Sequence, residues 1–345
     1  MRRIIGKDKK GRSVLINVPS YDEIYVNNQF GLLTAYDIAI SSNGSGSADA
    51  SAAASGTQNA IFSFGRISGG NVNATNLVSN TGVVANNILC VGTIRNSLAA
   101  AGYGTDKAIF GYGRTADFTY VSITNKVSNT GVMATDTTGV GTARQSLAAA
   151  GYGTDKAIFG YGYVPPQVNT TNLVSNTGVV ATDTTGVGTA REQLAAAGYG
   201  TDKAIFGYGF SSTLLSITNK VSNTGVVATD TTGVGTTRQS LAAAGYGGDK
   251  AIFGFGGSGA GSGVSTTNLV SNTGVVATDT AGVGTTRQYL AAAGYGGDKA
   301  IFGYGTGFSI YSLTNLVSNT GVVATDTIGV GTARYGLAAA GYSLS

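Results

Sequence analysis

The chain has 345 residues, of which 11 % are charged and 55 are Gly, so it is rich in small residues yet long enough to bury a large core. It contains no His, no Trp and a single Cys, Cys90. This composition excludes Ser-His-Asp and Cys-His catalytic sets, imidazole-ligated metal centres and a disulfide framework. We therefore expect a protein that is not an enzyme and that has no catalytic residue, cofactor or metal site. Cys90 is expected to be a small buried hydrophobe.

Positive charge is concentrated at the N-terminus. Residues 1–12 hold six Lys or Arg and one Asp, which leaves 15 basic and 16 acidic residues in the rest of the chain. A chain that is neutral beyond residue 12 lacks the basic face of a nucleic-acid-binding protein. We expect residues 1–12 to form a basic tail that either contacts an anionic partner or is solvated. No apolar run reaches the ~18–20 residues of a membrane helix, and no apolar segment of a secretory signal follows the tail. The chain is therefore expected to be made in the cytoplasm without a signal peptide and not to insert into a membrane.

Internal repeats dominate the remainder of the chain. The string KAIFGYG or a close variant begins at residues 59, 107, 156, 203, 250 and 299, in steps of 47 to 49 residues. Each copy follows an LAAAGYG-like segment and precedes a variable stretch, a TNLVSNTG-like segment and a VVATDTTG-like segment. Four short segments rich in β-branched, aromatic and Gly residues are typical of one blade of a β-propeller. We therefore predict an all-β propeller.

The segments differ in side-chain size in a way that predicts their place in a blade. The LAAAGYG segment has the smallest residues and is expected to be the innermost strand, where the blades converge. In the KAIFGYG strand, alternation predicts that Phe110 and Tyr112 share one face and that Gly111 leaves the other face shallow, so that blades stack ring into groove. The Asp-Lys pairs that begin this strand, such as Asp106-Lys107, are expected to be solvated turns.

The strand count predicts seven blades. The innermost segment recurs seven times, the last copy at residues 337–340, whereas the other three segments recur six times each. The missing three are assigned to residues 13–18, 23–31 and 32–37, so that N- and C-terminal strands share the closing blade. Residues 13–345 would then be one propeller domain. The alternative is six blades, with the first 50 residues as a separate arm and the last strand paired with residues 59–95.

The D-K-A-I-F-G-Y-G strand followed by a variable loop resembles the kelch-type β-propeller repeat over essentially the whole chain. The kelch Gly doublet is here Gly-Tyr-Gly, and the kelch Trp is absent. Kelch enzymes that resemble galactose oxidase use His and Tyr at copper, and this activity does not carry over to a chain without His. The near-identical repeats are also similar in style to propeller-type structural proteins of tailed-phage particles.

An Arg ends the last segment of six repeats, and an Asp or Asn stands eight residues before it. One interpretation is a ring of guanidinium groups at a channel mouth that holds an anion or acidic glycan. The other is a set of inter-blade Arg side chains bonded to carbonyls or to the neighbouring Asp. Strict repetition favours the second interpretation. The six residues are Arg95, Arg144, Arg191, Arg238, Arg287 and Arg334.

The loop after the KAIFGYG strand is where the repeats disagree most. In a four-stranded meander this loop lies at the same end as the segment that leads into the innermost strand. Aromatic residues on varied loops over a constant scaffold suggest a recognition face, and drift at a tolerant loop is the alternative. The candidate binding residues are Phe118, Tyr120, Tyr163, Pro165, Phe210, Phe308 and Tyr311.

We therefore predict a non-enzymatic propeller of a tailed-phage virion, in the tail, a fibre or the capsid surface. Its partners would be other virion subunits or a host-surface glycan. The alternative is a cellular or secreted adhesion or carbohydrate-binding propeller. A glycan-degrading enzyme is a third hypothesis, against which the lack of His and of unique carboxylates argues.

Overall fold

The computed structural model describes residues 2–7, 13–18, 58–259 and 263–343. The chain divides into two compact units, residues 1–52 and 53–345. The division falls after Ala52 rather than after residue 12, where the sequence placed it.

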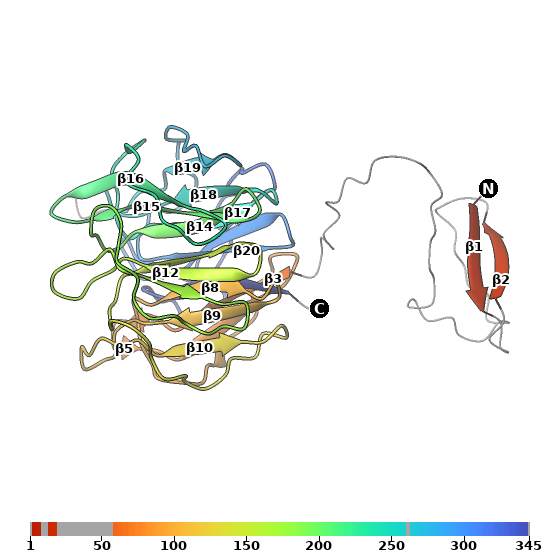
Figure 1. Ribbon diagram of the computed structural model, residues 1–345, viewed down its shortest axis with the longest axis horizontal. Coiled ribbons are helices and arrows are strands. Elements are labelled where there is room, and N and C mark those ends of the chain that lie inside the picture. The colour runs from red at the N-terminus through yellow and green to blue at the C-terminus, as the bar shows by residue number, and fades with distance from the viewer. Residues whose placement is uncertain (1, 8–12, 19–57, 260–262, 344–345) are drawn as a thin grey trace. The chain divides into compact units, whose positions relative to one another are not determined.

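The first unit contains an antiparallel hairpin of β1 (Arg2–Lys7) and β2 (Ser13–Val18), labelled in Figure 1. Val18 pairs with Arg2 and Ser13 with Lys7. Residues 13–18 therefore pair with the segment predicted to be a basic tail, and they do not supply a strand to a blade. The other two segments assigned to the closing blade, 23–31 and 32–37, lie outside the described residues.

The second unit is built from six antiparallel sheets of three or four strands, all with the same order in space. The innermost strands are β8 (Ala99–Tyr103), β11 (Ala148–Tyr152), β14 (Ala195–Tyr199), β17 (Ala242–Tyr246), β20 (Ala291–Tyr295) and β23 (Ala338–Ser343). The middle strands are β3 (Gln58–Ser63), β9 (Lys107–Gly111), β12 (Lys156–Gly160), β15 (Lys203–Phe210), β18 (Lys250–Gly254) and β21 (Lys299–Gly303). The third strands are β6 (Ala74–Val78), β10 (Thr124–Val127), β13 (Thr171–Val174), β16 (Leu214–Val221), β19 (Thr267–Val270) and β22 (Thr314–Val317).

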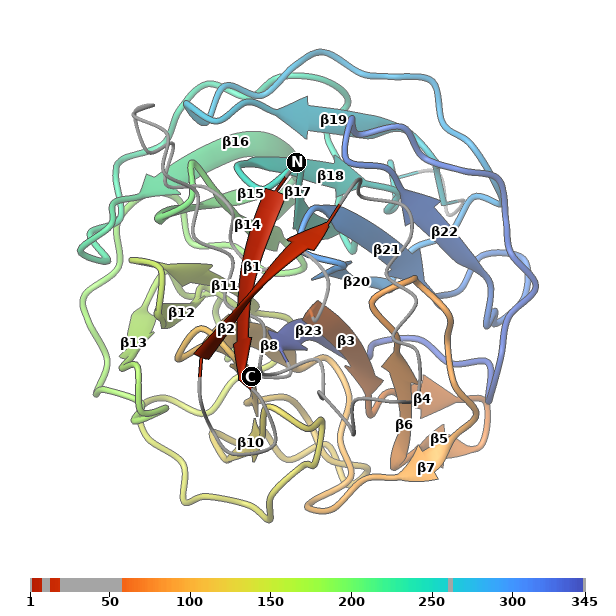
Figure 2. The ribbon, with the colours of Figure 1, turned by 90° about the vertical axis from the view of Figure 1, so that its right-hand side faces the viewer.

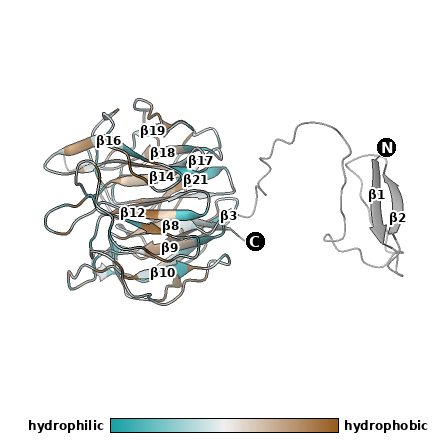
Figure 3. Cartoon of the chain, viewed as in Figure 1, coloured by the Kyte–Doolittle hydropathy of each residue, from teal (hydrophilic) through white to brown (hydrophobic). Residues whose placement is uncertain are grey.

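The fourth segment of each repeat is mostly irregular and does not form a continuous β-strand. It pairs with the third strand through isolated bridges such as Thr124 with Thr137, and only β7 (Ile88–Leu89) is a strand there. In the first blade the loop after the middle strand folds back as β4 (Arg66–Ile67) and β5 (Gly70–Asn71). In the β15–β16 blade the two strands extend into a longer hairpin, and the outer part of β16 is coloured hydrophobic in Figure 3.

The sheets follow one another around a ring (Figure 2). Each innermost strand contacts the next in the order β8, β11, β14, β17, β20 and β23, and β23 contacts β8. The described ring therefore has six blades, not the seven predicted, because β23 pairs with β3 from Ala338–Ser63 to Ser343–Gln58. The prediction of an all-β propeller is confirmed, and the C-terminal strand does share its blade with strands from earlier in the chain. Those strands are β3, β6 and β7 rather than a set that begins with residues 13–18. The six-blade alternative is the one that the strand pairing supports.

Two rings of backbone hydrogen bonds link the blades around the axis. At one end of the channel, six backbone N–H groups, one from each blade, each donate to a carbonyl of the preceding blade at 2.7–2.9 Å. The circle begins with Ser146 N donating to Ser97 O and closes with Ser97 N donating to Gly336 O. At the other end, six N–H groups form a second circle, for example Gly104 to Asp155 O at 2.7 Å and Ser343 to Asp106 O at 3.0 Å. These bonds satisfy backbone groups that the ends of the innermost strands would otherwise leave unpaired.

The blades stack through an aromatic ring seated on a glycine. Phe253 lies against the Cα of Gly207, where a Cβ atom would come within 2.7 Å of the ring. Ring-into-groove stacking is therefore confirmed. The prediction that Phe110 and Tyr112 share a face is wrong. Phe110 contacts Phe64 of the preceding blade and Tyr112 contacts Phe159 of the next, because Tyr112 has φ +64° and ends the strand alternation.

Candidate functional site

The variable loops after the middle strands and the segments that lead into the innermost strands lie at the same end of the ring. We call this end the loop face. Arg114, at the start of a variable loop, pairs with Asn96, three residues before the innermost strand of the same blade, and with Tyr120 at the loop's end. We call the opposite end, which holds the tight turns between innermost and middle strands and after the third strand, the turn face.

The predicted binding residues lie on the loop face but differ in exposure, and all follow a middle strand except Phe210, which ends β15. Phe118 and Phe308 are 64 % and 101 % exposed, and Pro165 is also exposed. Tyr120 and Tyr163, from neighbouring blades, meet edge to face with ring centroids 6.2 Å apart. Two others are half-buried and held by backbone bonds, from Phe210 N to Glu192 O and from Tyr311 N to Gly305 O, both 2.8 Å. The structure thus brings together only the Tyr120–Tyr163 pair.

The six repeated Arg side chains are fully buried between blades. Arg191 donates through Nε to Tyr208 O at 2.8 Å, through Nη1 to Thr189 O at 3.1 Å and through Nη2 to Asn219 Oδ1 at 2.7 Å. Its guanidinium also lies 4.2 Å from the ring centroid of Tyr161 in the preceding blade. Because the side chain has no exposed surface, this group is unavailable to an anion at the channel mouth.

The repeated Asp residues latch neighbouring blades at the rim. Asp230 accepts bonds from Thr189 N at 3.0 Å, Thr189 Oγ1 at 2.6 Å and Asn219 Nδ2 at 2.8 Å. Thr189 stands in the preceding repeat, so the Asp serves the Arg of that repeat rather than the Arg eight residues after it. Burial raises the pKa of Asp230, but the bonds from Thr189 and Asn219 outweigh it and lower this pKa. The pKa values of four other Asp carboxyls are lowered in the same way, because bonds from the equivalent Thr and Asn outweigh the effect of burial. These residues are Asp136, Asp183, Asp279 and Asp326.

These latches predict an acid-sensitive ring. A carboxylate whose folded-state pKa is lowered adds stability above the ordinary Asp pKa of about 3.9, and this stability is lost as pH falls through the folded-state pKa. The melting temperature should therefore fall steeply below about pH 4. Asn87 occupies the sixth latch, where it accepts from Thr332 N at 3.2 Å and donates to Thr332 Oγ1 at 2.6 Å. Changing the five Asp to Asn should keep the fold at pH 7 and flatten the acid limb of the melting curve followed by circular dichroism. An unchanged acid limb would contradict this role.

A second group of loop-face residues was not identified from the sequence. Each repeated Arg is separated from the constant Leu-Ala-Ala by a dipeptide that varies among the repeats, and this variation was the available signal. The second residue of each dipeptide forms the hydrogen-bonded circle at the loop face, which we call the axial ring. Its members are Ser97, Ser146, Gln193, Ser240, Tyr289 and Gly336.

Polar contacts surround the axial ring. Gln193 Oε1 accepts from Ser240 Oγ at 2.8 Å and from Tyr289 OH at 3.4 Å. Glu192 is 9 % exposed, and burial raises the pKa of its carboxyl although a 3.4 Å bond from Gln167 Nε2 opposes this rise. No other repeat has a carboxylate at the position of Glu192.

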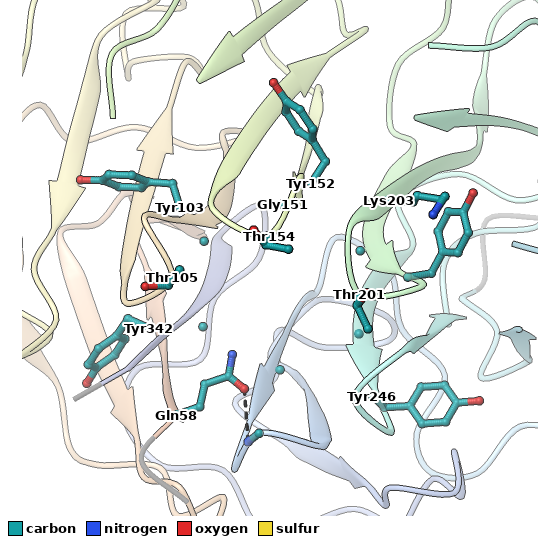
Figure 4. Close-up of a pocket in the computed structure, with 18 of the residues that line it drawn as sticks. Gln58, Tyr103, Thr105, Gly151, Tyr152, Thr154, Thr201, Lys203, Tyr246 and Tyr342 are labelled. Carbon is teal, nitrogen blue, oxygen red and sulfur yellow. Dashed lines mark hydrogen bonds between the residues drawn. The ribbon is translucent and has the colours of Figure 1, made fainter. Parts of the chain in front are cut away.

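The turn face holds a cavity of about 320 Å³ at the other mouth of the channel. Figure 4 shows Thr105, Thr154, Thr201 and Gln58 around its opening, with the Tyr rings turned away from it. Gln58 Oε1 accepts from Gly297 N at 3.2 Å. The Lys residues of this lining each pair with the preceding Asp, as Lys203 does with Asp202 at 2.7 Å. The mouth is therefore built of repeated, internally compensated turns.

Cys90 is buried, as predicted, in a cluster that includes Phe64 and Leu98, and burial raises the pKa of its thiol. Within the described ranges, no three acidic or Cys side chains are grouped as metal ligands. The described residues also contain no helix long and apolar enough to cross a membrane. Comparison with models of known protein families finds no match, and no curated protein is detectably similar to the chain.

Proposed function

We propose that this protein is a non-enzymatic recognition propeller whose loop face binds a partner, as a tail, fibre or capsid-surface component of a tailed-phage virion. The partner would be another virion subunit or a host-surface glycan. The phage setting rests on the resemblance of the repeats, and an adhesion propeller of a cell would use the same face.

The observation that carries the proposal is where the repeats differ. The turns of the turn face repeat almost unchanged as Gly-Thr-Asp-Lys or Gly-Gly-Asp-Lys and as Ser-Asn-Thr-Gly, and the inter-blade Arg and Phe residues are likewise constant. The variable loops and the axial ring differ from blade to blade, and both lie on the loop face. Constant parts of a repeat build the scaffold, whereas differences gathered on one face are typical of a binding surface.

Two exposed aromatic side chains allow a matched test. Changing Phe118 and Phe308 to Ser should weaken binding to bacterial cells or purified particles at least about tenfold, because exposed aromatic anchors dominate such interfaces. The control changes Val132 and Val275, 66 % and 62 % exposed after the turn-face turns, to Ser. Binding of fluorescently labelled protein is measured across a panel of strains and particles.

The proposal fails if the wild type binds no cell or particle, or if the loop-face and turn-face variants bind equally well. Sedimentation of the wild type with and without particles separates the two settings. A virion component should enter symmetric assemblies, whereas an adhesin can act as a monomer.

A further inference from the structure

The axial ring turns a six-fold scaffold into an asymmetric mouth. Its cavity, about 70 Å³, is lined by the axial ring and by the Leu that follows each member. On one side Gln193, Ser240 and Tyr289 are joined by hydrogen bonds, and Tyr289 reaches Gln193 from two blades away. On the other side Ser97 and Ser146 present small side chains and Gly336 presents none. The mouth is therefore closed on one side by bonded side chains and open on the other.

These side chains are kept in a backbone conformation that disfavours them. Ser97, Ser146, Gln193, Ser240 and Tyr289 all have φ +54°, and Gly336 has φ +62°. Residues other than Gly cost about 1–3 kcal/mol each in this region, and such strain collects at functional sites. Gly336 makes the same backbone bonds as the others, so Gly is sufficient for the circle. The five side chains are thus not required by the fold.

The groups around the mouth are mainly uncharged donors and acceptors. Asn96 donates to Asn71 Oδ1 at 2.6 Å, and Ser97 donates to Asn96 Oδ1 at 2.7 Å. Gln145 Oε1 and Arg114 Nε are buried without a hydrogen-bond partner in the described part of the chain. Buried polar atoms are normally satisfied, but neither of these residues lines the cavity, so the recognition falls to the axial ring itself.

An aromatic surface borders the open side. Tyr289 and Tyr335 meet edge to face with centroids 6.2 Å apart, and Tyr335 directly precedes Gly336. A sugar ring combines hydroxyl groups, which both donate and accept, with an apolar face of C–H groups that packs on aromatic rings. Amide, hydroxyl and phenol groups together with a Tyr pair match that chemistry, and they offer no cluster of cations for an acidic sugar.

Resting on the proposed function of the loop face, we propose that the axial ring is its specificity centre and binds the end of a neutral oligosaccharide at Gly336, Ser97 and Ser146. Gln193 and Tyr289 form the wall against which the terminal sugar is oriented.

Gly336→Gln tests the site by filling its open side. Gln already occupies the equivalent position 193 at φ +54°, and a Cβ at Gly336 would have no neighbour closer than 3.6 Å, so the ring should still fold. The probe is an array of neutral hexose and N-acetylhexosamine oligosaccharides with sialylated and sulfated counterparts. We expect the wild type to bind neutral members and Gly336→Gln to lose at least about tenfold in affinity, as loss of well-placed hydrogen bonds implies.

Two further variants keep the result interpretable. Gln193→Ser introduces the residue found at three other positions of the ring and should also weaken binding about tenfold. If Gly336→Gln melts at a lower temperature than the wild type, the binding of Gln193→Ser tests the site instead. Thr154→Gly on the turn face, where other repeats have Gly248 and Gly297, should bind as the wild type does.

Binding to no member of the array, to acidic members alone, or equally by wild type and both ring variants would overturn the inference. Cell or particle binding that depends on Phe118 and Phe308, but not on Gly336 or Gln193, would do the same while leaving the recognition function intact. Failure of the recognition function is seen separately, as loss of all binding to cells and particles.

Discussion

Replacing Arg191 with Met is expected to lower the free energy of unfolding by about 3–5 kcal/mol, the cost of leaving buried partners of a charged group unpaired. The change keeps the stem of the side chain but removes the donors to Tyr208 O, Thr189 O and Asn219 Oδ1, all inside the contact between two blades. It also removes the guanidinium from the face of Tyr161. Urea unfolding followed by circular dichroism measures the loss.

Two controls separate charge from geometry. Arg191→Lys keeps the charge but not the planar donor fork, so its stability should fall between those of the wild type and Arg191→Met. Lys126→Met removes a cation whose Nζ donates to Thr177 O at the surface and should change stability by about 0.5 kcal/mol or less. Wild-type stability of Arg191→Met would contradict the role of the buried Arg side chains in joining the blades.

Removing β23 should unfold the ring. Ending the chain after Thr332 deletes Arg334, Leu337, Tyr342 and the whole ladder with β3, and the last two side chains pack into the cores of two neighbouring blades. Two large buried side chains contribute roughly 1.5–3 kcal/mol each, and the truncation also opens both circles of backbone bonds at Gly336 and Ser343. Because domains are stable by only about 5–15 kcal/mol, the truncated chain should lose its cooperative melting transition and sediment as aggregates. A monomer with the wild-type transition would contradict closure by β23.

The sequence predicted the repeated parts of the fold well. The Ala-Ala-Ala-Gly segments are innermost strands because only small side chains fit where the strands converge, and the Phe–Gly contacts between blades follow from a bulky and a shallow face. The blade number was not predictable in the same way. Segments 13–18 and 32–37 have strand-like sequences, and the choice of β3 as the partner of β23 depends on pairing across 275 residues or more, from Ala338 with Ser63 onward.

The candidate site was only partly visible. The variable loops stood out because they differ in length and in aromatic content, whereas the axial ring differs at single positions inside constant flanks. Its importance depends on the left-handed backbone of Ser97 and its equivalents and on the closed circle of bonds, and strand alternation predicts neither. The same limitation explains Tyr112, whose left-handed backbone turns it toward the next blade rather than beside Phe110.

We infer that residues 53–345 form a complete six-bladed ring that carries the loop face. Deleting residues 1–52 and measuring the melting transition and the cell or particle binding of the product tests it most directly. The product should be a soluble monomeric ring with the melting temperature and binding of the full chain, because β3 and β23 close it without those residues. Loss of the cooperative transition would show that the first 52 residues complete the ring, as a seven-bladed propeller requires.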